Sequence, residues 1–173
     1  MRPFALLPLA AFVLLLSGCG YHTLGAAAHL PPDVKTIAVP LFLSRTDAYH
    51  TETVMTDAVI RELTTRTRLR MIPTESPEAG AVLHGTILNE TVAPLTYNSA
   101  TQQSSSFLIT VMASVTVNAA DGTVLYQNKN LVYREQYQST TDLATFIQED
   151  PAAVDRLSRA FARELVGDVL EGL

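Results

Sequence analysis

The sequence is poor in the side chains that form disulfides and metal sites. Its 173 residues include one cysteine, Cys19, four histidines and no tryptophan. A single thiol excludes an internal disulfide, so the fold must be stabilised by packing and hydrogen bonds. The histidines are scattered and show no metal-ligand spacing with one another, so we expect no zinc site and no other metal.

Positive charge is also scarce. The chain has 12 Lys and Arg against 17 Asp and Glu, a formal net charge of −5. We therefore expect no nucleic-acid partner, because such binding requires a broad basic surface, and any binding of anions must be local. A candidate group consists of Arg61, Arg66, Arg68 and Arg70. These could hold phosphates of an anionic lipid, although cations near a helix C-terminus are also favoured by the helix dipole.

Signatures of catalysis are missing as well. The serines at 104–106 lie in a polar stretch without the glycine-bracketed elbow of a hydrolase nucleophile. Glu149 and Asp150 precede a proline, where acidic residues cap a helix and stabilise its dipole rather than act as an acid–base pair. No glycine-rich phosphate loop is present. We therefore expect a protein that is not an enzyme and binds no cofactor.

The N-terminus has the features of a bacterial lipoprotein signal. Arg2 and the apolar stretch 4–16 fit a signal peptide, and this stretch is shorter than the ~20 residues that span a bilayer. Leu16-Ser17-Gly18-Cys19 has the form of a lipobox, in which the thiol receives a diacylglyceryl group. We expect removal of the signal peptide, 1–18, and lipidation of Cys19, with palmitate among the acyl chains. The alternative is a buried cysteine in an uncleaved helix.

The residue after the cysteine bears on location. Gly20 stands where a retention signal would place Asp, so we expect a lipid-anchored protein on the periplasmic side of the outer membrane. Two or three acyl chains on one residue make an effectively permanent anchor. Residues 19–35 are expected to form the lipidated N-terminus and a connector, followed by a single domain over 36–173.

Hydrophobic periodicity predicts two helices. Over 51–66 apolar residues recur at helical spacing, namely Met55, Ala58, Val59 and Leu63. A second helix is predicted after Asp150-Pro151, with Asp150 as its cap and Pro151 in its first turn. Its apolar face consists of Val154, Leu157, Phe161, Leu165 and Val169.

Strands are predicted in the remaining apolar segments. Residues 36–42 are β-rich but contain Pro40, which should end the strand or place it at an edge, and 69–72 are expected to form a brief strand. Residues 81–91 alternate loosely, whereas 107–117 alternate strictly. Asp121-Gly122 supplies a tight turn into a partner strand over 124–138. The polar, uncharged stretch 94–106 is predicted to be a loop or hairpin tip.

This element order predicts an α+β fold. Two helices packed on one face of a roughly four-stranded, mostly antiparallel (mixed) sheet would bury both apolar helix faces. The sequence contains no internal repeat and no second membrane segment.

Several segments form a series when they are taken in order. They are CGYH at 19–22 with Gly25, IAVPLF at 37–42, the Glu52, Thr56, Ala58-Val59, Glu62-Leu63 pattern followed by Arg66-Thr67, AVLHGTI at 81–87, YREQY at 133–137 and FIQEDPAAVDRLSRAFARELV at 146–166. Each segment alone is weak. Together with the lipobox and the element order, the series resembles the lipopolysaccharide-assembly lipoproteins (LptE-like) over nearly the whole mature chain.

This resemblance implies a non-enzymatic role in lipopolysaccharide transport. Members of the family have two helices on a four-stranded sheet, plug an LptD-type outer-membrane β-barrel, help that barrel assemble, and contact lipopolysaccharide on its way to the cell surface. The implied partners are therefore the barrel, lipopolysaccharide, and the membrane through the lipid anchor. Cys19 matches the lipidation site of the family directly. The alternative is a free periplasm-facing lipoprotein that binds a lipid or glycan without a barrel partner.

The contact residues of the family carry over only in part. Basic residues near the loop between the long strands are linked to lipopolysaccharide binding in the family, but 96–106 contains no Lys or Arg. Polar residues there could instead hydrogen-bond sugar or barrel-lumen groups, the alternative being an ordinary solvated hairpin tip. The candidates are Tyr97, Asn98, Gln102 and Gln103, and the candidate anion contacts are Arg66, Arg68 and Arg134.

Overall fold

A computed structural model describes residues 30–31, 33–47, 50–98, 103–138 and 143–171. Its elements in chain order are β1 (Thr36–Ala38), β2 (Leu43–Ser44), α2 (Thr51–Arg66), β3 (Arg70–Ile72), β4 (Ala81–Asn98), β5 (Gln103–Ala119), β6 (Val124–Gln138) and α3 (Leu143–Glu171). The expected signal peptide 1–18, the lipidation site Cys19 and the candidate residue Gln102 lie outside the described residues, as does most of the expected connector 19–35.

One layer of the fold is a mixed sheet of six strands. The strand order is β3-β1-β4-β5-β6, and β2 also pairs with β4. The long strands β4, β5 and β6 are antiparallel neighbours, whereas β1 is parallel to both β3 and β4. The mixed α+β class is confirmed. The strand count exceeds the predicted four because the segment around Pro40 separates two short strands, and the brief strand near 70 also joins the sheet.

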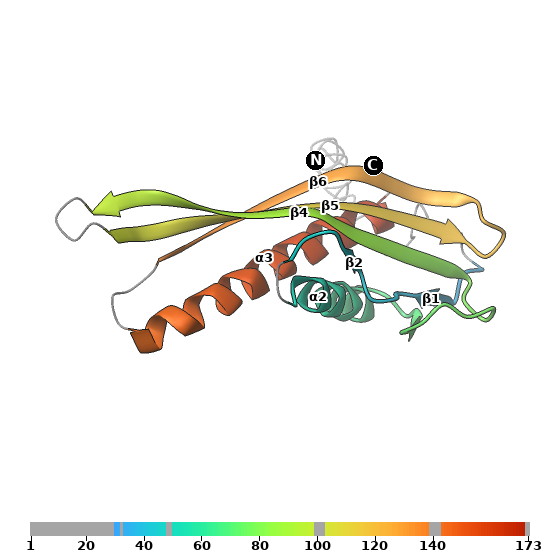
Figure 1. The fold of residues 1–173 in the computed structure, drawn as a ribbon. Helices are drawn as coiled ribbons and strands as arrows, with labels where there is room; N and C mark the ends of the chain where they lie inside the picture. The colour runs from blue at the N-terminus through green and yellow to red at the C-terminus, as the bar shows by residue number, and fades with distance from the viewer. Residues whose placement is uncertain (1–29, 32, 48–49, 99–102, 139–142, 172–173) are drawn as a thin grey trace, which may run out of the picture.

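Both helices cover the same face of this sheet (Figure 1). The alternating burial along β5 shows which face the helices cover. The odd-numbered residues from 109 to 117 are almost fully buried, and the even-numbered residues between them are partly exposed. Helix α2 packs on α3, and α3 packs on β6. The predicted packing of two helices on one face is therefore confirmed.

Helix α2 has the predicted bounds, and its four predicted apolar residues are buried. The Thr67 amide donates to the Leu63 carbonyl at 2.9 Å, after which the backbone is extended. The Thr56 hydroxyl joins α2 to the segment between β1 and β2. Its oxygen accepts a hydrogen bond from the Phe42 amide at 3.0 Å, and its hydrogen is donated to the Glu52 carbonyl at 2.6 Å.

Helix α3 begins earlier than predicted. It starts at Leu143, so Pro151 lies inside the helix and Asp150 is not its cap. Proline has no amide hydrogen, so the carbonyl of Ile147 loses its usual partner four residues on. The loss of this one bond does not prevent the preceding residues from being helical. The Asp150-Pro151 pair therefore does not mark the start of α3. Downstream, Leu157, Phe161, Leu165 and Val169 are buried as predicted.

The β4–β5 hairpin is longer than predicted. Much of 94–106, which is predicted to be a loop or hairpin tip, is paired strand: β4 continues to Asn98, which pairs with Gln103 at the start of β5. Within this segment the Thr96 and Ser106 hydroxyls lie 2.8 Å apart. The polar composition is typical of a loop, but it does not prevent pairing, because the ladder is formed by backbone groups.

The β5–β6 hairpin closes at the predicted turn. Gly122 has a φ of 86°, a conformation that glycine adopts without steric penalty. The Asp121 Oδ1 atom accepts a hydrogen bond from the Thr123 amide at 2.9 Å, and this bond lowers the pKa of Asp121.

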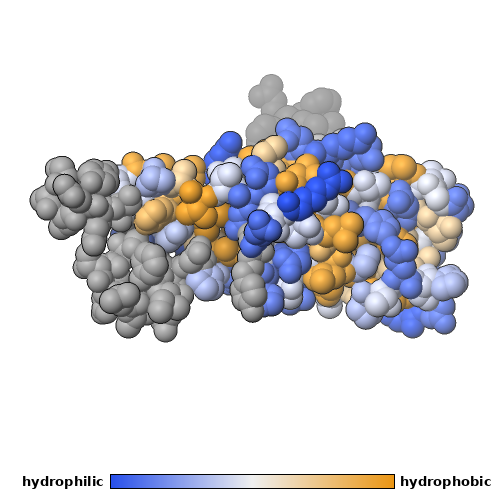
Figure 2. Space-filling model, in the orientation of Figure 1, coloured by the Kyte–Doolittle hydropathy of each residue, from blue (hydrophilic) through white to orange (hydrophobic). Residues whose placement is uncertain are grey.

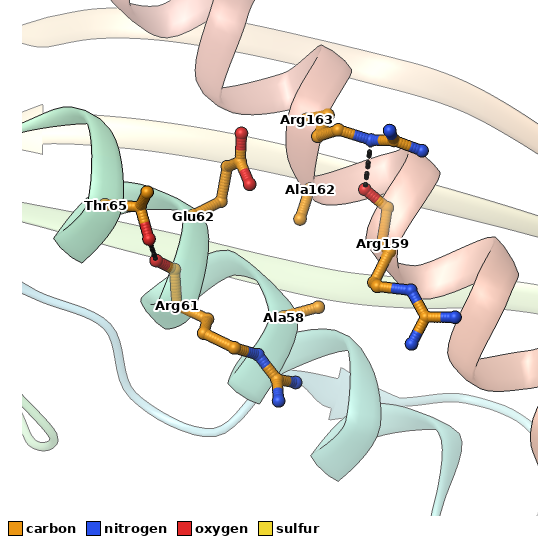
Figure 3. Close-up of a pocket in the computed structure, with 7 residues that line it drawn as sticks. All are labelled: Ala58, Arg61, Glu62, Thr65, Arg159, Ala162 and Arg163. Carbon is orange, nitrogen blue, oxygen red and sulfur yellow. Dashed lines mark hydrogen bonds between the residues drawn. The ribbon is translucent and has the colours of Figure 1, made fainter.

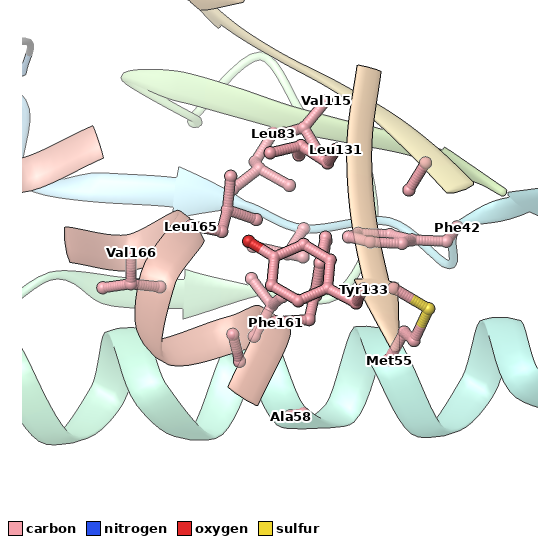
Figure 4. Close-up of a cluster of buried hydrophobic side chains, with 14 of the residues drawn as sticks. Phe42, Met55, Ala58, Leu83, Val115, Leu131, Tyr133, Phe161, Leu165 and Val166 are labelled. Atoms are coloured by element: carbon pink, nitrogen blue, oxygen red, sulfur yellow. The ribbon is translucent and has the colours of Figure 1, made fainter. Parts of the chain in front are cut away.

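The core lies between the covered sheet face and the helices (Figure 4). Phe161 of α3 meets Tyr133 of β6 edge-on, with ring centroids 5.1 Å apart, and meets Phe42 at 6.2 Å. The Phe42 ring lies against β4 at Gly85, where an added Cβ would be 2.4 Å from a ring carbon. This close approach requires glycine at position 85.

Candidate functional site

A groove between the two helices gathers arginines from both of them (Figure 3). It has a volume of about 220 Å³ and is lined by Ala58, Arg61, Glu62 and Thr65 of α2 and by Arg159, Ala162 and Arg163 of α3. Ala58 and Ala162 are buried, and their small side chains leave the space between the helices open. Three guanidinium groups and one carboxylate line the groove, so it is locally positive in an acidic chain.

Some of the charged side chains that line the groove already form ion pairs within the chain. The Glu62 carboxylate lies 2.7 Å from the Arg66 Nε atom, and Arg159 pairs with Asp155 one turn earlier in α3. The Arg163 Nε atom donates to the Arg159 carbonyl at 3.3 Å. Among the described residues, no carboxylate pairs with the guanidinium of Arg61 or of Arg163.

The structure separates the four arginines that the sequence groups together. Arg61 lines the groove, whereas Arg66 is paired with Glu62 and lies near Gly167 of α3, where an added Cβ would be 3.6 Å from the Arg66 Nη1 atom. Arg68 is exposed just after α2. Arg70 pairs with Glu78 at 3.3 Å on the outer strand β3.

The hairpin candidates lie at the opposite end of the sheet from these helix-end arginines. Tyr97, Asn98 and Gln103 are at the end of the β4–β5 hairpin, whereas β3 and β1 join the sheet near the start of β4. The 18 residues of β4 span about 60 Å at about 3.3 Å per residue. The two sets therefore do not form one site.

Arg134 occupies a third place. It is exposed in β6, opposite Thr110 of β5. Its neighbour Tyr133 is buried under the helices, so Arg134 faces the other side of the sheet. The structure thus distributes the predicted contact residues over three surfaces.

Sequence reasoning missed the two groove arginines of α3, Arg159 and Arg163. A signal was present, because Arg156, Arg159 and Arg163 recur at intervals of three and four and therefore share one helix face. Their approach to Arg61 depends on how α2 and α3 pack. Periodicity within one helix cannot provide that information.

A second polar cluster lies between β6 and α3. Burial raises the pKa of Tyr133, and the negative charge of Glu164 raises it further. Burial also raises the pKa of Tyr126, whose hydroxyl donates to the Asp168 Oδ2 atom at 3.4 Å. Both hydroxyls are therefore protonated at neutral pH, and these tyrosines pack α3 against the sheet.

The described residues offer neither a metal-binding cluster nor a membrane-spanning helix. In the described part of the chain, no three His, Cys, Asp or Glu side chains gather as a set of metal ligands. Neither described helix combines the length and the hydrophobicity needed to cross a bilayer. On the side of the molecule shown in Figure 2, hydrophobic areas are separated by hydrophilic side chains.

Comparisons with known sequences give two findings. A family model described as lipopolysaccharide-assembly (LptE) matches residues 34–169. No curated protein sequence matches the chain.

Solved structures share the fold at low sequence identity. A lipoprotein from Caulobacter crescentus CB15 has a TM-score of 0.55 and 10% identity, over 77% of this chain and 88% of that one. Lipoprotein B from Nitrosomonas europaea has a TM-score of 0.55 and 10% identity, over 82% and 84% of the two chains. A minor lipoprotein from Acinetobacter baumannii has a TM-score of 0.50 and 13% identity, over 82% and 94%. At these identities the likeness concerns the fold alone.

Proposed function

Because the chain belongs to the lipopolysaccharide-assembly (LptE) family, we propose that it plugs and helps assemble an LptD-type β-barrel that delivers lipopolysaccharide to the cell surface. The observation that carries this proposal is the family match over 34–169, which spans both helices and all six strands of the sheet almost completely. The protein acts without catalysis, by occupying the barrel and by contacting its cargo.

The N-terminal sequence supports an outer-membrane location for this role. A signal peptide over 1–18 would deliver the chain across the inner membrane, and lipidation of Cys19 would then hold it on the periplasmic side of the outer membrane. A tethered domain meets a barrel in the same membrane at a high effective concentration. A wide barrel leaves a lumen that a protein domain can fill.

The shape of the domain is consistent with a plug. The β4–β5 hairpin extends well beyond α2 in Figure 1, and its last pairs bring Tyr97, Asn98 and Gln103 to one end of the molecule. We assign these residues as contacts with the barrel lumen or with sugar groups of lipopolysaccharide. Arg66, Arg68 and Arg134 are assigned as further contacts with anionic groups, on surfaces away from the hairpin end.

The proposal is tested by depletion and by co-purification. Depletion of the protein is expected to reduce the amount of mature barrel in the outer membrane, and an affinity tag on the protein is expected to co-purify the barrel in stoichiometric amounts. A Cys19→Ala variant, which cannot be lipidated, should capture less barrel because it loses the tether. Normal barrel levels after depletion, with no co-purified barrel, would contradict the proposal.

A further inference from the structure

We propose that the groove between α2 and α3 binds a phosphate group through Arg61, Arg159 and Arg163. The three side chains come from two helices that pack together in the folded chain, so the site exists only in the native structure. No residue of the β4–β5 hairpin takes part in it. The groove is thus a binding site separate from the proposed hairpin contacts.

The residue types in the groove suit a phosphate. A guanidinium group presents its N–H donors in a planar fork, and two such forks bind the oxygens of one phosphate from different sides. In Figure 3 the Arg61 side chain from α2 and the Arg159 side chain from α3 extend toward the same end of the groove, whereas the Arg163 guanidinium extends across α3, away from α2. A ligand between the helices would therefore meet donors from both.

The existing ion pairs leave positive charge available. The carboxylate in the groove, Glu62, is already paired with Arg66, which lies outside the lining. Arg159 is paired with Asp155, whereas Arg61 and Arg163 have no carboxylate partner among the described residues. An incoming anion would thus be attracted by two unbalanced guanidinium groups.

The groove floor indicates what else the ligand can carry. Ala58 and Ala162 are 3% and 1% exposed, so their methyl groups give the groove a buried apolar part, while the arginines around them are exposed. Such a site suits a phosphate monoester attached to a larger body, such as a phosphorylated glycolipid headgroup, as well as free phosphate. The glycolipid source rests on the proposed function, whereas the phosphate chemistry rests on the groove alone.

Calorimetric titration of the detergent-solubilised mature protein at low salt tests the site. Three probes separate the sources of phosphate: inorganic pyrophosphate, detergent micelles containing a bisphosphorylated acylated glucosamine disaccharide, and the same micelles after phosphatase treatment. The test variant Arg61→Gln/Arg163→Gln removes the two unbalanced charges. The matched control Arg45→Gln/Lys129→Gln removes two exposed positive charges elsewhere.

We expect the test variant to bind the phosphorylated probes about tenfold more weakly or worse, and the control to stay within about twofold of the wild type. Arg61→Lys/Arg163→Lys should restore binding only in part, because lysine keeps the charge but loses the fork. Binding of the micelles alone assigns the site to a headgroup phosphate, and binding of pyrophosphate alone assigns it to free phosphate. Both outcomes support the site.

Three results would overturn the inference. The first is that the wild type binds neither phosphorylated probe, and the second is that the test and control variants lose the same amount of affinity. The third is that the wild type binds the phosphatase-treated micelles as tightly as the untreated ones. These results are independent of the barrel. A protein that co-purifies with the barrel but binds no phosphate loses the groove site and keeps the proposed function. A protein that binds phosphate without a barrel partner does the reverse.

Discussion

At the scale of single residues, the packing of Phe42 depends on the absence of a side chain at one position of β4. Phe42 is 2% exposed and lies between Phe161 and Gly85, so its ring has little room to move. Dense cores transmit such a constraint, since an added methyl group displaces its neighbours. The segment that carries Phe42 is also hydrogen-bonded to Thr56, which limits the relief that backbone movement can give.

Gly85→Ala should destabilise the protein by about 1–3 kcal/mol, because the new Cβ would lie 2.4 Å from the Phe42 ring. The free energy of unfolding from urea titration followed by circular dichroism measures the effect. Gly167→Ala is the control, since its Cβ would meet only Arg66 at 3.6 Å and alanine favours a helix interior by up to about 1 kcal/mol. Equal stability of the wild type and Gly85→Ala would refute the close contact.

Ionisation of the Tyr133 hydroxyl makes the free energy of unfolding depend on pH in the alkaline range. Its pKa is raised by burial and by Glu164, so the folded chain holds this proton more tightly than the unfolded chain. The resulting stabilisation is fully present below the unfolded pKa of about 10 and is lost as the pH rises toward the folded pKa. Tyr126, whose pKa is raised in the same direction, contributes with the same sign.

In the Tyr133→Phe variant, the free energy of unfolding should therefore fall less steeply above pH 10 than in the wild type. Urea unfolding at several pH values between about 8 and 11 gives the slope of the unfolding free energy against pH for each protein. Among the described residues, two tyrosines have a raised pKa and the variant removes one of them, so its slope should be smaller but not zero. Identical slopes for the two proteins would show that Tyr133 ionises alike in both states.

At the scale of elements, α3 contains an interior proline. Pro151 is exposed, and the helix extends on both sides of it, from Leu143 to Glu171. Proline is about 3 kcal/mol less favourable than alanine inside a helix, although it also restricts the unfolded chain. The helix is therefore less stable at this point than its length suggests.

Pro151→Ala should raise the free energy of unfolding by about 2 kcal/mol, because residue 151 gains an amide that can donate to the Ile147 carbonyl. Thermal and urea unfolding measure the change. Pro77→Ala is the control, since Pro77 is exposed in a turn and its replacement should give no gain. A loss of stability in Pro151→Ala would show that this proline favours the fold in a way that helix propensity does not describe.

Elements also differ in how far the sequence alone predicts them. Helix α2 and the β5–β6 hairpin follow from local patterns: apolar spacing over 51–66, strict alternation over 107–117, and the Asp121-Gly122 turn. The predicted start of α3 at Asp150-Pro151 was wrong, and the prediction of a loop or hairpin tip over 94–106 did not include the strand pairing found there. There the local signals are an acidic–proline pair, which does not stop α3 although Pro151 removes one backbone hydrogen bond, and a polar stretch, whose backbone groups pair as a ladder.

The parallel pairing of β1 and the arginine groove could not be predicted for a different reason. Ile37 pairs with Met71 and with Ala81, and Arg61 lines the same groove as Arg159 and Arg163, only because distant segments pack together. Composition and periodicity describe neighbours along the chain. Composition and periodicity therefore indicated the arginines near the end of α2 but not the arginines of α3 that line the same groove.

At the scale of the whole molecule, the hairpin end and the helix-end arginines lie at opposite ends of the sheet. Under the proposed function, the domain would therefore present different groups to different depths of the barrel lumen.

Photo-crosslinkers placed at Tyr97, Asn98 or Gln103 are expected to capture the barrel, because the proposed function puts the hairpin end against its lumen. Mass spectrometry of the crosslinked product identifies the partner. The control positions are Asp33 and Asn130, which are exposed and belong to neither set of proposed contacts. Capture of glycolipid alone from the hairpin end would favour a free lipid-binding lipoprotein over a plug.

The position of β1 has a mechanical consequence. This strand is the first of the sheet along the chain, yet it lies inside the sheet, with β3 on one side and β4 on the other. Ile37, Ala38 and Val39 are at most 1% exposed. A pull transmitted from a lipid on Cys19 would load an interior strand with neighbours on both sides, and would have to break both sets of backbone bonds before it could peel the chain from its sheet.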